Sequence, residues 1–289
     1  MRLPGPFDIQ RVQEHVWPHR ELEFVLLEDA TPQEFAKTRV SRDERFVNVA
    51  DGTLIMSFHS FVVRTPHGNL LVDTCVGDHK TYPTLAEWHQ QEFPYLERLG
   101  QVGLAPDDID FVCCTHLHGD HVGWNTRLDN GRWVPTFGNA RYLMAADELG
   151  YWENIHTTEP DNIYQHVWRE SLLPVIEHGR VDRVASDHEI LPGIRLHPAP
   201  GHTPGNVVIE LADGGKRAVM SGDVVHHPVQ IERPEWSSQF DGDPDMARIT
   251  RRQLLERIAD TDTELLGAHF SGPTALRVVS NAEGFDYRA

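Results

Sequence analysis

Three histidines and an aspartate fall within the six positions 116–121, in the stretch THLHGDH. These side chains, His116, His118, Asp120 and His121, are costly to bury unpaired, yet they follow an apolar run typical of a buried strand. Imidazole and carboxylate are ligands that divalent ions such as zinc prefer. The cluster therefore predicts a metal site in the loop that leaves this strand. Three of the four residues would hold one ion, so the cluster alone leaves the number of metals open.

Residues of the same kinds follow predicted strands later in the chain. His202 lies in the turn PGHTPG, Asp223 follows a strand in SGD, and His269 ends the stretch LLGAH. Together with the cluster at 116–121 they offer nitrogen and oxygen ligands for a second ion, with one carboxylate that could bridge the two.

Alternating strands and helices would place these residues at strand ends. We expect strands at 54–64, 70–76, 107–115, 189–197, 205–212, 217–224 and 263–270, the last of these being the final strand. We expect a hairpin turn at 66–69, a strand that becomes helical over 140–152, a helical stretch near 84–100 interrupted by Pro94, and an amphipathic helix over 244–260. Two groups of strands with helices between them favour a layered α/β domain.

Composition restricts the possible partners. The chain has 289 residues, 39% of them hydrophobic, and a formal net charge of -18 from 44 acidic and 26 basic side chains. This charge repels nucleic-acid backbones and anionic membranes, so we expect neither as a partner. The N-terminus lacks an apolar segment of signal-peptide length, and the three cysteines, Cys75, Cys113 and Cys114, suggest no disulfide framework. We therefore expect a cytoplasmic protein in which Cys113 and Cys114 are small buried residues.

The ordered motifs resemble those of the metallo-β-lactamase fold superfamily, in its dinuclear hydrolase branch. They are Asp73 in LLVDT, then THLHGDH, PGHTPG, SGD and the late His269, and they extend over most of the chain. The resemblance implies an α/β fold, a four-layer αββα sandwich with the metals in a cleft at one edge of the two sheets. We expect one domain over residues 1–289, with residues 1–50 as an N-terminal arm near the cleft or across the interface of a homodimer.

The resemblance also implies a role for each ligand. His116, His118 and His202 should hold the first metal, Asp120, His121 and His269 the second, and Asp223 should bridge them. Asp73 should orient a ligand from outside the metal shell. The cofactors would be two divalent ions, with Zn²⁺ expected. Cys75 departs from the family, which often has glycine there, so the local backbone geometry is an open question.

Differences between branches of the superfamily narrow the expected reaction. Asp223 argues against true β-lactamases, which usually have cysteine or serine there, and His118 argues against the flavin-linked diiron oxygen reductases, which have glutamate. The chain ends 20 residues after His269 (289 − 269), too soon for the helical segment of glyoxalase-II-like thioesterases. The net charge argues against RNA-processing members. N-acyl-homoserine-lactone lactonases and methyl-parathion-hydrolase-like enzymes remain, and the stretch GDVVHHPVQ with the acidic SSQFDGDPD and its following helix resembles the second group more closely.

The expected function is hydrolysis of a carboxylic ester or lactone, with a metal-bridging hydroxide as nucleophile. The alternatives are a phosphotriester hydrolase of the organophosphate type and a non-catalytic ligand-binding relative. We expect Asp120 and His226 to take part in catalysis, His226 by donating a hydrogen bond, although a purely structural role for His226 is as compatible with the sequence. Trp124, Phe270 and His226 are the expected residues of the substrate pocket because they flank ligand motifs.

Overall fold

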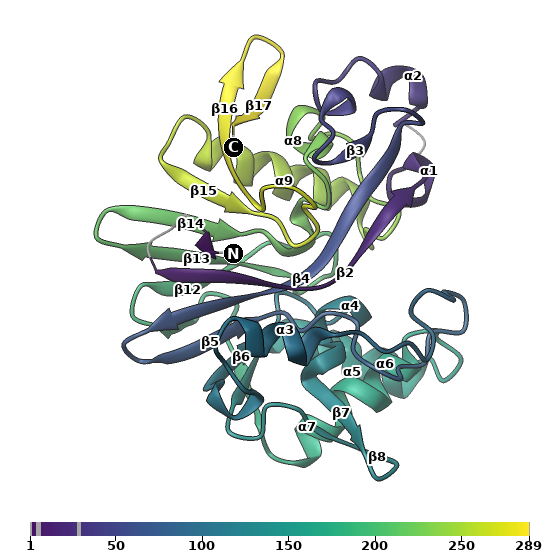
Figure 1. Cartoon of the computed structure of the whole chain (residues 1–289), viewed down its shortest axis with the longest axis vertical. Coiled ribbons are helices and arrows are strands. Elements are labelled where there is room, and N and C mark those ends of the chain that lie inside the picture. Colours follow the sequence, from purple (N-terminus) through teal and green to yellow (C-terminus); the bar gives the residue numbers. More distant parts are fainter. Residues whose placement is uncertain (1, 4–6, 28–29, 289) are drawn as a thin grey trace. The chain divides into compact units, whose positions relative to one another are not determined.

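The computed structural model describes residues 2–3, 7–27 and 30–288 (Figure 1). Its strands are β1 (Arg2–Leu3), β2 (Asp8–Arg20), β3 (Val47–Asn48), β4 (Thr53–Thr65), β5 (Gly68–Val72), β6 (Phe111–Cys113), β7 (Thr126–Asp129), β8 (Arg132–Pro135), β9 (Arg141–Ala145), β10 (Val181–Val184), β11 (Glu189–Leu191), β12 (Ile194–Pro198), β13 (Val207–Asp213), β14 (Lys216–Met220), β15 (Thr263–Leu266), β16 (Ala275–Asn281) and β17 (Gly284–Arg288). Its helices are α1 (Leu22–Val25), α2 (Pro32–Phe35), α3 (Tyr95–Gln101), α4 (Gly119–Val122), α5 (Ala146–Thr158), α6 (Gln165–Val167), α7 (Leu173–Glu177), α8 (Val229–Glu232) and α9 (Pro244–Ile258). Short helical turns are η1 (Val40–Arg42), η2 (Pro106–Asp108), η3 (Gly123–Asn125), η4 (Trp168–Leu172) and η5 (Gly222–Val224).

The chain divides into two compact units. The first consists chiefly of Phe7–His15 and Phe58–Ile190, and the second of Val16–Ser57 and Leu191–Ala289. Residues 1–50 therefore contribute to both units. The expectation of a single domain with an N-terminal arm is not decided by this division and stays a prediction, as does the expected homodimer.

An eight-stranded sheet has the order β1-β2-β4-β5-β6-β9-β10, with β3 paired to β4. The hairpin β4–β5 turns at Pro66 and His67, as predicted, and places Phe61 opposite Val72. From β5 onward the neighbouring strands run parallel, through β6 and β9 to β10. Parallel strands need crossover connections, and the helical segments α3, α4 and α5 lie in those connections. The carboxyl ends of β5, β6 and β9 consequently share one edge of the first unit.

A seven-stranded sheet has the order β11-β12-β13-β14-β15-β16-β17. In it β14 and β15 are parallel, with Met220 opposite Leu266, while β12, β13 and β14 run antiparallel in succession. Figure 1 shows this sheet in green and yellow, with the hairpin β16–β17 at its end. The ends of β12, β14 and β15 therefore lie at one edge of the second unit.

The predicted elements are largely confirmed, with corrections. The strand predicted over 189–197 is two strands, β11 and β12, and the strand predicted over 217–224 ends at Met220, before η5. The strand-to-helix change over 140–152 is β9 followed by α5, and the helix predicted over 244–260 is α9, capped by the Asp243 side chain, which accepts a hydrogen bond from the Met246 amide. The helix predicted near 84–100 was wrong in its first half, because α3 begins only after Pro94. The strand predicted as the last one ends at Leu266, and β16 and β17 follow it.

The core of the first unit is formed by aromatic and aliphatic side chains such as Tyr95, Phe137 and Tyr142. All three cysteines are buried and free, which confirms the burial predicted for Cys113 and Cys114. None of the helices in the described part of the chain combines the length and the apolar composition that a membrane crossing requires.

Candidate metal centre

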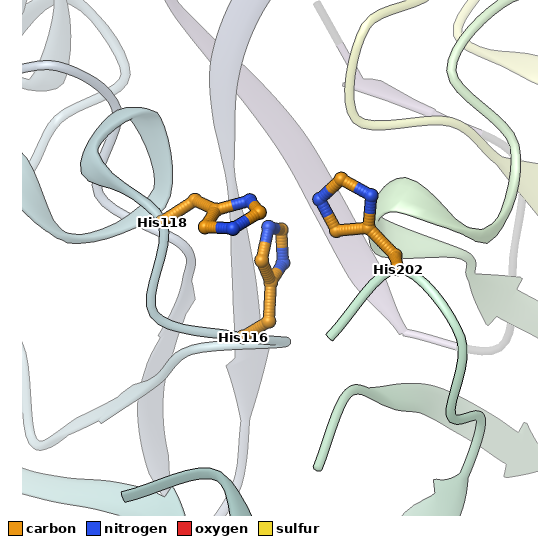
Figure 2. A group of neighbouring side chains, drawn as sticks. All are labelled: His116, His118 and His202. Atoms are coloured by element: carbon orange, nitrogen blue, oxygen red, sulfur yellow. The ribbon is translucent and has the colours of Figure 1, made fainter. Parts of the chain in front are cut away.

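The first unit presents four of the predicted ligands on one short loop. His116 and His118 follow β6, and Asp120 and His121 lie in the single turn of α4. The ring of His116 lies 4.7 Å from that of His118 and 4.1 Å from that of His121, measured between centroids. Figure 2 shows His116 and His118 projecting from the same loop. We call His116, His118, Asp120 and His121 the first half-site.

Asp73 holds this loop from the neighbouring strand end. Because β5 and β6 are parallel and Val72 lies opposite Cys113, Asp73 meets the residues just beyond β6. Its carboxylate accepts hydrogen bonds from the Thr115 amide (2.7 Å) and from Nδ1 of His121 (2.9 Å). A carboxylate can only accept here, so the His121 proton resides on Nδ1 and its lone pair on Nε2. This contact is the one that the predicted orienting role of Asp73 requires.

The backbone around Asp73 answers the question raised by Cys75. Asp73 has φ 57° and Cys75 has φ 49°, both in the left-handed region that favours glycine. Cys75 therefore adopts a glycine-like conformation, in which its carbonyl accepts a hydrogen bond from the Gly123 amide (2.7 Å). The side chain that cysteine adds at this position is a buried thiol beside the Ser60 hydroxyl, at 3.4 Å.

A second carboxylate braces the middle of the loop. Oε1 of the buried Glu148, near the start of α5, accepts hydrogen bonds from the Leu117 amide (3.0 Å) and from Nε1 of Trp152 (2.7 Å). Trp152 packs edge-on against the His118 ring, and Tyr164 stacks on that ring with centroids 5.1 Å apart. The ring of His118 is thus positioned by two aromatic side chains that the sequence did not single out.

Two glycines are required where the loop approaches other parts of the first unit. A Cβ on Gly119 would lie 2.5 Å from the Tyr82 hydroxyl oxygen, and one on Gly123 would lie 1.8 Å from the Val76 carbonyl oxygen. Both distances are far shorter than van der Waals contact, so a side chain at Gly119 would displace the Tyr82 ring, and at Gly123, where the neighbour is backbone, only glycine fits.

Trp124, a predicted pocket residue, is almost fully buried in the first unit. Its ring stacks on Tyr95 with centroids 5.3 Å apart, and its Nε1 donates to Oε1 of Glu14 (2.7 Å). Phe270, the other predicted aromatic, is fully buried in the second unit, where it packs against Phe46. Their expected role in lining a substrate pocket stays a prediction.

The second unit brings together the remaining predicted ligands. The parallel strands β14 and β15 place Met220 opposite Leu266. Asp223 follows Met220 by three residues, and His269 follows Leu266 by three residues. His202 lies in the turn between β12 and β13, at the same edge. Sequence positions far apart are therefore brought together by the register of the sheet. We call His202, Asp223 and His269 the second half-site.

Imidazole nitrogens converge on the Asp223 carboxylate. Nε2 of His269 lies 3.1 Å from Oδ1, and Nε2 of His202 lies 3.4 Å from Oδ2. Nε2 of His226 lies 3.2 Å from the same Oδ2. The side chain of Asp223 is buried, so these contacts lie away from bulk water.

The outer nitrogens of two of these rings are fixed by acceptors. Nδ1 of His202 lies 3.0 Å from Oδ1 of Asp241, and Nδ1 of His269 lies 3.1 Å from the Ser57 carbonyl oxygen. Both acceptors require the proton on Nδ1, which places the lone pair of each neutral ring on Nε2, facing Asp223. Lone pairs that face a carboxylate repel it, and a cation between them turns this repulsion into attraction. The second half-site therefore fits a divalent metal.

Burial sets the charge state of the residues around Asp223. Burial lowers the pKa of His226, and the neighbouring Asp223 carboxylate opposes this only in part. Burial raises the pKa of Asp241, but the hydrogen bond from His202 and nearby positive groups outweigh it and hold that pKa below its usual value. The lowered pKa makes Asp241 a carboxylate at neutral pH, and burial favours the neutral form of the His226 imidazole. His226 also has ligand atoms close to those of His202 and Asp241, within 4.8 Å.

The chain belongs to the metallo-beta-lactamase superfamily, whose sequence pattern matches residues 59–269. The predicted resemblance and the α/β metallo-β-lactamase fold are thus confirmed. Among curated relatives, the N-acyl homoserine lactonase AiiA of Bacillus thuringiensis subsp. kurstaki is 30% identical over 160 residues, or 55% of this chain and 54% of the relative. The lactonase AiiB of Agrobacterium fabrum is 31% identical over 103 residues, or 31% and 33% of the two chains. The chain thus spans about half the length of the first of these relatives and a third of the second.

Solved structures agree on the fold. AidC, a dizinc quorum-quenching lactonase bound to the product N-hexanoyl-L-homoserine, superposes with a TM-score of 0.80 at 21% identity, covering 100% of this chain and 96% of AidC. AbOPH, a hydrolase of the beta-lactamase superfamily, gives a TM-score of 0.78 at 21% identity, covering 98% and 94%. At these identities the likeness concerns the fold alone.

Proposed function

We propose that this protein is a metal-dependent hydrolase of a lactone or carboxylic ester. Membership of the superfamily and the lactonase relatives support this assignment. The observation that carries it is the convergence of the Nε2 atoms of His202 and His269 on the buried Asp223 carboxylate, at 3.1–3.4 Å. This donor set suits a divalent cation such as zinc.

The proposal includes the ligand assignment made from the sequence. In that assignment His116, His118 and His202 would hold one ion and Asp120, His121 and His269 the other, with Asp223 bridging. When bound, such ions would lower the pKa of a water molecule and polarise the carbonyl of the substrate.

The protein's own residues would move the protons. The Asp120 side chain is 16% exposed, so its carboxylate is accessible to accept the proton that leaves an attacking water. His226 is neutral because of its burial and can donate one ring N–H to the carbonyl or leaving oxygen of the substrate. Its backbone amide donates to Oε1 of Gln230 (2.7 Å), which fixes the position of the residue.

A substrate panel on zinc-loaded protein tests the proposal. The panel contains N-hexanoyl homoserine lactone, p-nitrophenyl butyrate and the phosphotriester paraoxon, with kcat/KM measured for each. We expect the lactone or the ester to be the best substrate, and His116→Ala to lose both zinc and nearly all turnover. His188→Ala, which changes an exposed histidine of the same unit, should alter neither. Zinc-replete protein that hydrolyses none of the three would refute the proposal, and a preference for paraoxon would favour a phosphotriesterase instead.

A further inference from the structure

Arg251 is a fully buried arginine in the middle of α9, within the second unit. Its Nε donates to the Val224 carbonyl (2.8 Å), and its Nη1 donates to the carbonyls of Pro234 (2.9 Å) and Trp236 (2.8 Å). Its Nη2 lies 3.4 Å from Oδ2 of Asp241. A buried guanidinium is costly unless its donors are satisfied, and here they reach three separate parts of the chain. Val224 directly follows the predicted bridging ligand Asp223.

Asp241 links this guanidinium to a predicted metal ligand. Its Oδ2 accepts a hydrogen bond from the Ser238 amide (2.9 Å) and faces Arg251, while its Oδ1 lies 3.0 Å from Nδ1 of His202. Both groups at Oδ2 can only donate. The carboxylate is therefore held in one orientation, with the other oxygen directed at the His202 ring.

We propose that Asp241 and Arg251 form an orienting pair for His202. Asp241 keeps the His202 proton on Nδ1, so that Nε2 is the nitrogen offered to the metal, and Arg251 keeps Asp241 in place. The same guanidinium holds the Val224 carbonyl, so the pair fixes two ligand-bearing segments at once. This inference rests on the proposed metal centre, and it assigns a role to the acidic stretch SSQFDGDPD and its following helix, which the proposed reaction does not use.

The isosteric substitution Asp241→Asn inverts the hydrogen bond to His202. The asparagine NH₂ group cannot face Ser238 and Arg251, because both are donors, so the amide oxygen must take that side. The NH₂ group then faces Nδ1 of His202, which has to accept, and the ring proton moves to Nε2. A ligand nitrogen that carries a proton cannot bind zinc until that proton leaves.

The experiment reads the tautomer and the metal affinity separately. The tautomer of His202 is measured by ¹⁵N NMR of histidine-labelled, metal-free protein, with the signal assigned by its loss in His202→Ala. Zinc affinity is measured by competition with a chromophoric chelator. For Asp241→Asn we expect the Nε2–H tautomer and a loss of zinc affinity of about 10- to 100-fold, with a melting temperature close to that of the wild type. Asp245→Asn, whose side chain is 90% exposed, is the matched control and should change neither quantity.

Arg251→Met tests the second member of the pair, with Arg252→Met, at an exposed position of the same helix, as its control. We expect Arg251→Met to lower zinc affinity at least as much as Asp241→Asn does, and Arg252→Met to leave it unchanged. If Arg251→Met does not fold, Asp241→Asn still decides the question. An Asp241→Asn protein that keeps the Nδ1–H tautomer overturns the proposal, whether or not zinc affinity falls, because a merely structural pair would not control the tautomer. The tautomer is read without metal, so this outcome is distinct from a failure of the proposed hydrolase activity.

Discussion

The buried Glu14 of β2 offers a sharp test of how the first half-site is supported. Its Oε1 accepts hydrogen bonds from the Gly77 amide (2.9 Å) and Nε1 of Trp124 (2.7 Å), and its Oε2 accepts from the Val76 amide (3.0 Å). Nδ1 of His15 lies 3.1 Å from the same Oε2. These contacts join β2 to the segment after Asp73 and to the turn that follows α4. The substitution Glu14→Gln changes one oxygen into an NH₂ group and leaves the shape unchanged.

The geometry sets the expected cost of this substitution. Nε2 of His15 accepts a hydrogen bond from Nε1 of Trp88 (3.1 Å), so Nδ1 of His15 carries the proton and donates to Glu14. Each oxygen of Glu14 therefore faces two donors, and a glutamine in either orientation turns its NH₂ group toward two of them. Hydrogen bonds to a charged acceptor contribute about 1.5–3 kcal/mol each. Because glutamine also avoids the burial of a charge, we expect a net loss of about 3 kcal/mol in the free energy of unfolding.

Urea unfolding at pH 7.5 measures this loss, and a double-mutant cycle with Trp124→Phe isolates the contact. Trp124→Phe removes the Nε1–H donor but keeps an aromatic ring against Tyr95. On its own, this substitution should lower the free energy of unfolding by about 2 kcal/mol. In the Glu14→Gln background the same change should cost much less, because the donor no longer has a charged acceptor. Glu256→Gln, at an exposed position of α9, is the control and should be neutral. An unchanged urea midpoint for Glu14→Gln, or additive effects in the cycle, would show that this hydrogen-bond arrangement is wrong.

Three further predictions concern pH, backbone packing and catalysis. Burial raises the pKa of Asp78 to about 6, so the folded state favours its neutral form and loses stability as pH rises from the unfolded pKa near 3.8 through 6. Asp78 is only half buried, so solvent screening reduces the expected effect. Asp78→Asn should raise the free energy of unfolding by about 1 kcal/mol at pH 7.5 and by almost nothing at pH 3.5. Urea titrations at the two pH values measure the difference. Gly123→Ala should lower the free energy of unfolding by more than about 4 kcal/mol and abolish soluble expression, since the new Cβ meets the Val76 carbonyl. Gly150→Ala is the control, because no described atom lies within 4 Å of a Cβ added at this position of α5. Its free energy of unfolding, measured by thermal unfolding, should rise by about 0.5–1 kcal/mol. His226→Ala should keep its zinc, as determined by elemental analysis, and lose more turnover on an alkyl ester than on an aryl ester, since the more basic alkoxide gains more from the hydrogen bond that the neutral ring donates. Equal losses would reduce His226 to a positioning residue, and loss of zinc would make it a ligand.

The ligand motifs could be predicted because their chemistry is local. A histidine and aspartate cluster after an apolar run indicates a metal loop whatever the rest of the fold. The later ligands follow the same logic, because Asp223 and His269 leave adjacent parallel strands at equal distances beyond Met220 and Leu266. Sequence pattern alone identifies each strand end but not the pairing that brings the ends together.

Local propensity failed where contacts distant in sequence determine the backbone. The stretch before Pro94 has a helical sequence pattern, yet the Asp78 carboxylate accepts a hydrogen bond from the Phe93 backbone amide (2.6 Å), and the Lys80 carbonyl accepts one from the Gln90 backbone amide (2.8 Å). These bonds take backbone donors that a helix would use within itself. A chain folded back on residues 78–80 therefore replaces the helix, and α3 begins only at Tyr95.

The supporting carboxylates were missed for a different reason. Glu14, Glu148 and Asp241 resemble ordinary surface residues in the sequence. The residues next to them in the chain do not indicate which hydrogen-bond donor each carboxylate contacts in the fold. The acidic stretch around Asp241 was noticed, but only as a likeness between families. The contacts of Asp241 are with a guanidinium ten residues later and with an imidazole 39 residues earlier.

In both half-sites the fold determines which nitrogen of a histidine ring carries the proton, and this is visible only in the structure. In each, proposed ligand histidines have Nδ1 directed at a hydrogen-bond acceptor, which would leave Nε2 as the nitrogen available to a metal. The pairs are His116 with the Thr115 hydroxyl (3.2 Å), His121 with Asp73 (2.9 Å), His202 with Asp241 (3.0 Å) and His269 with the Ser57 carbonyl (3.1 Å). Because the Thr115 hydroxyl donates to Asp73, its oxygen can accept from His116, so this pair follows the same rule. Four rings whose tautomer is set by the fold need no rearrangement when a metal binds. Each supporting acceptor should therefore affect metal affinity more strongly than it affects the stability of its unit.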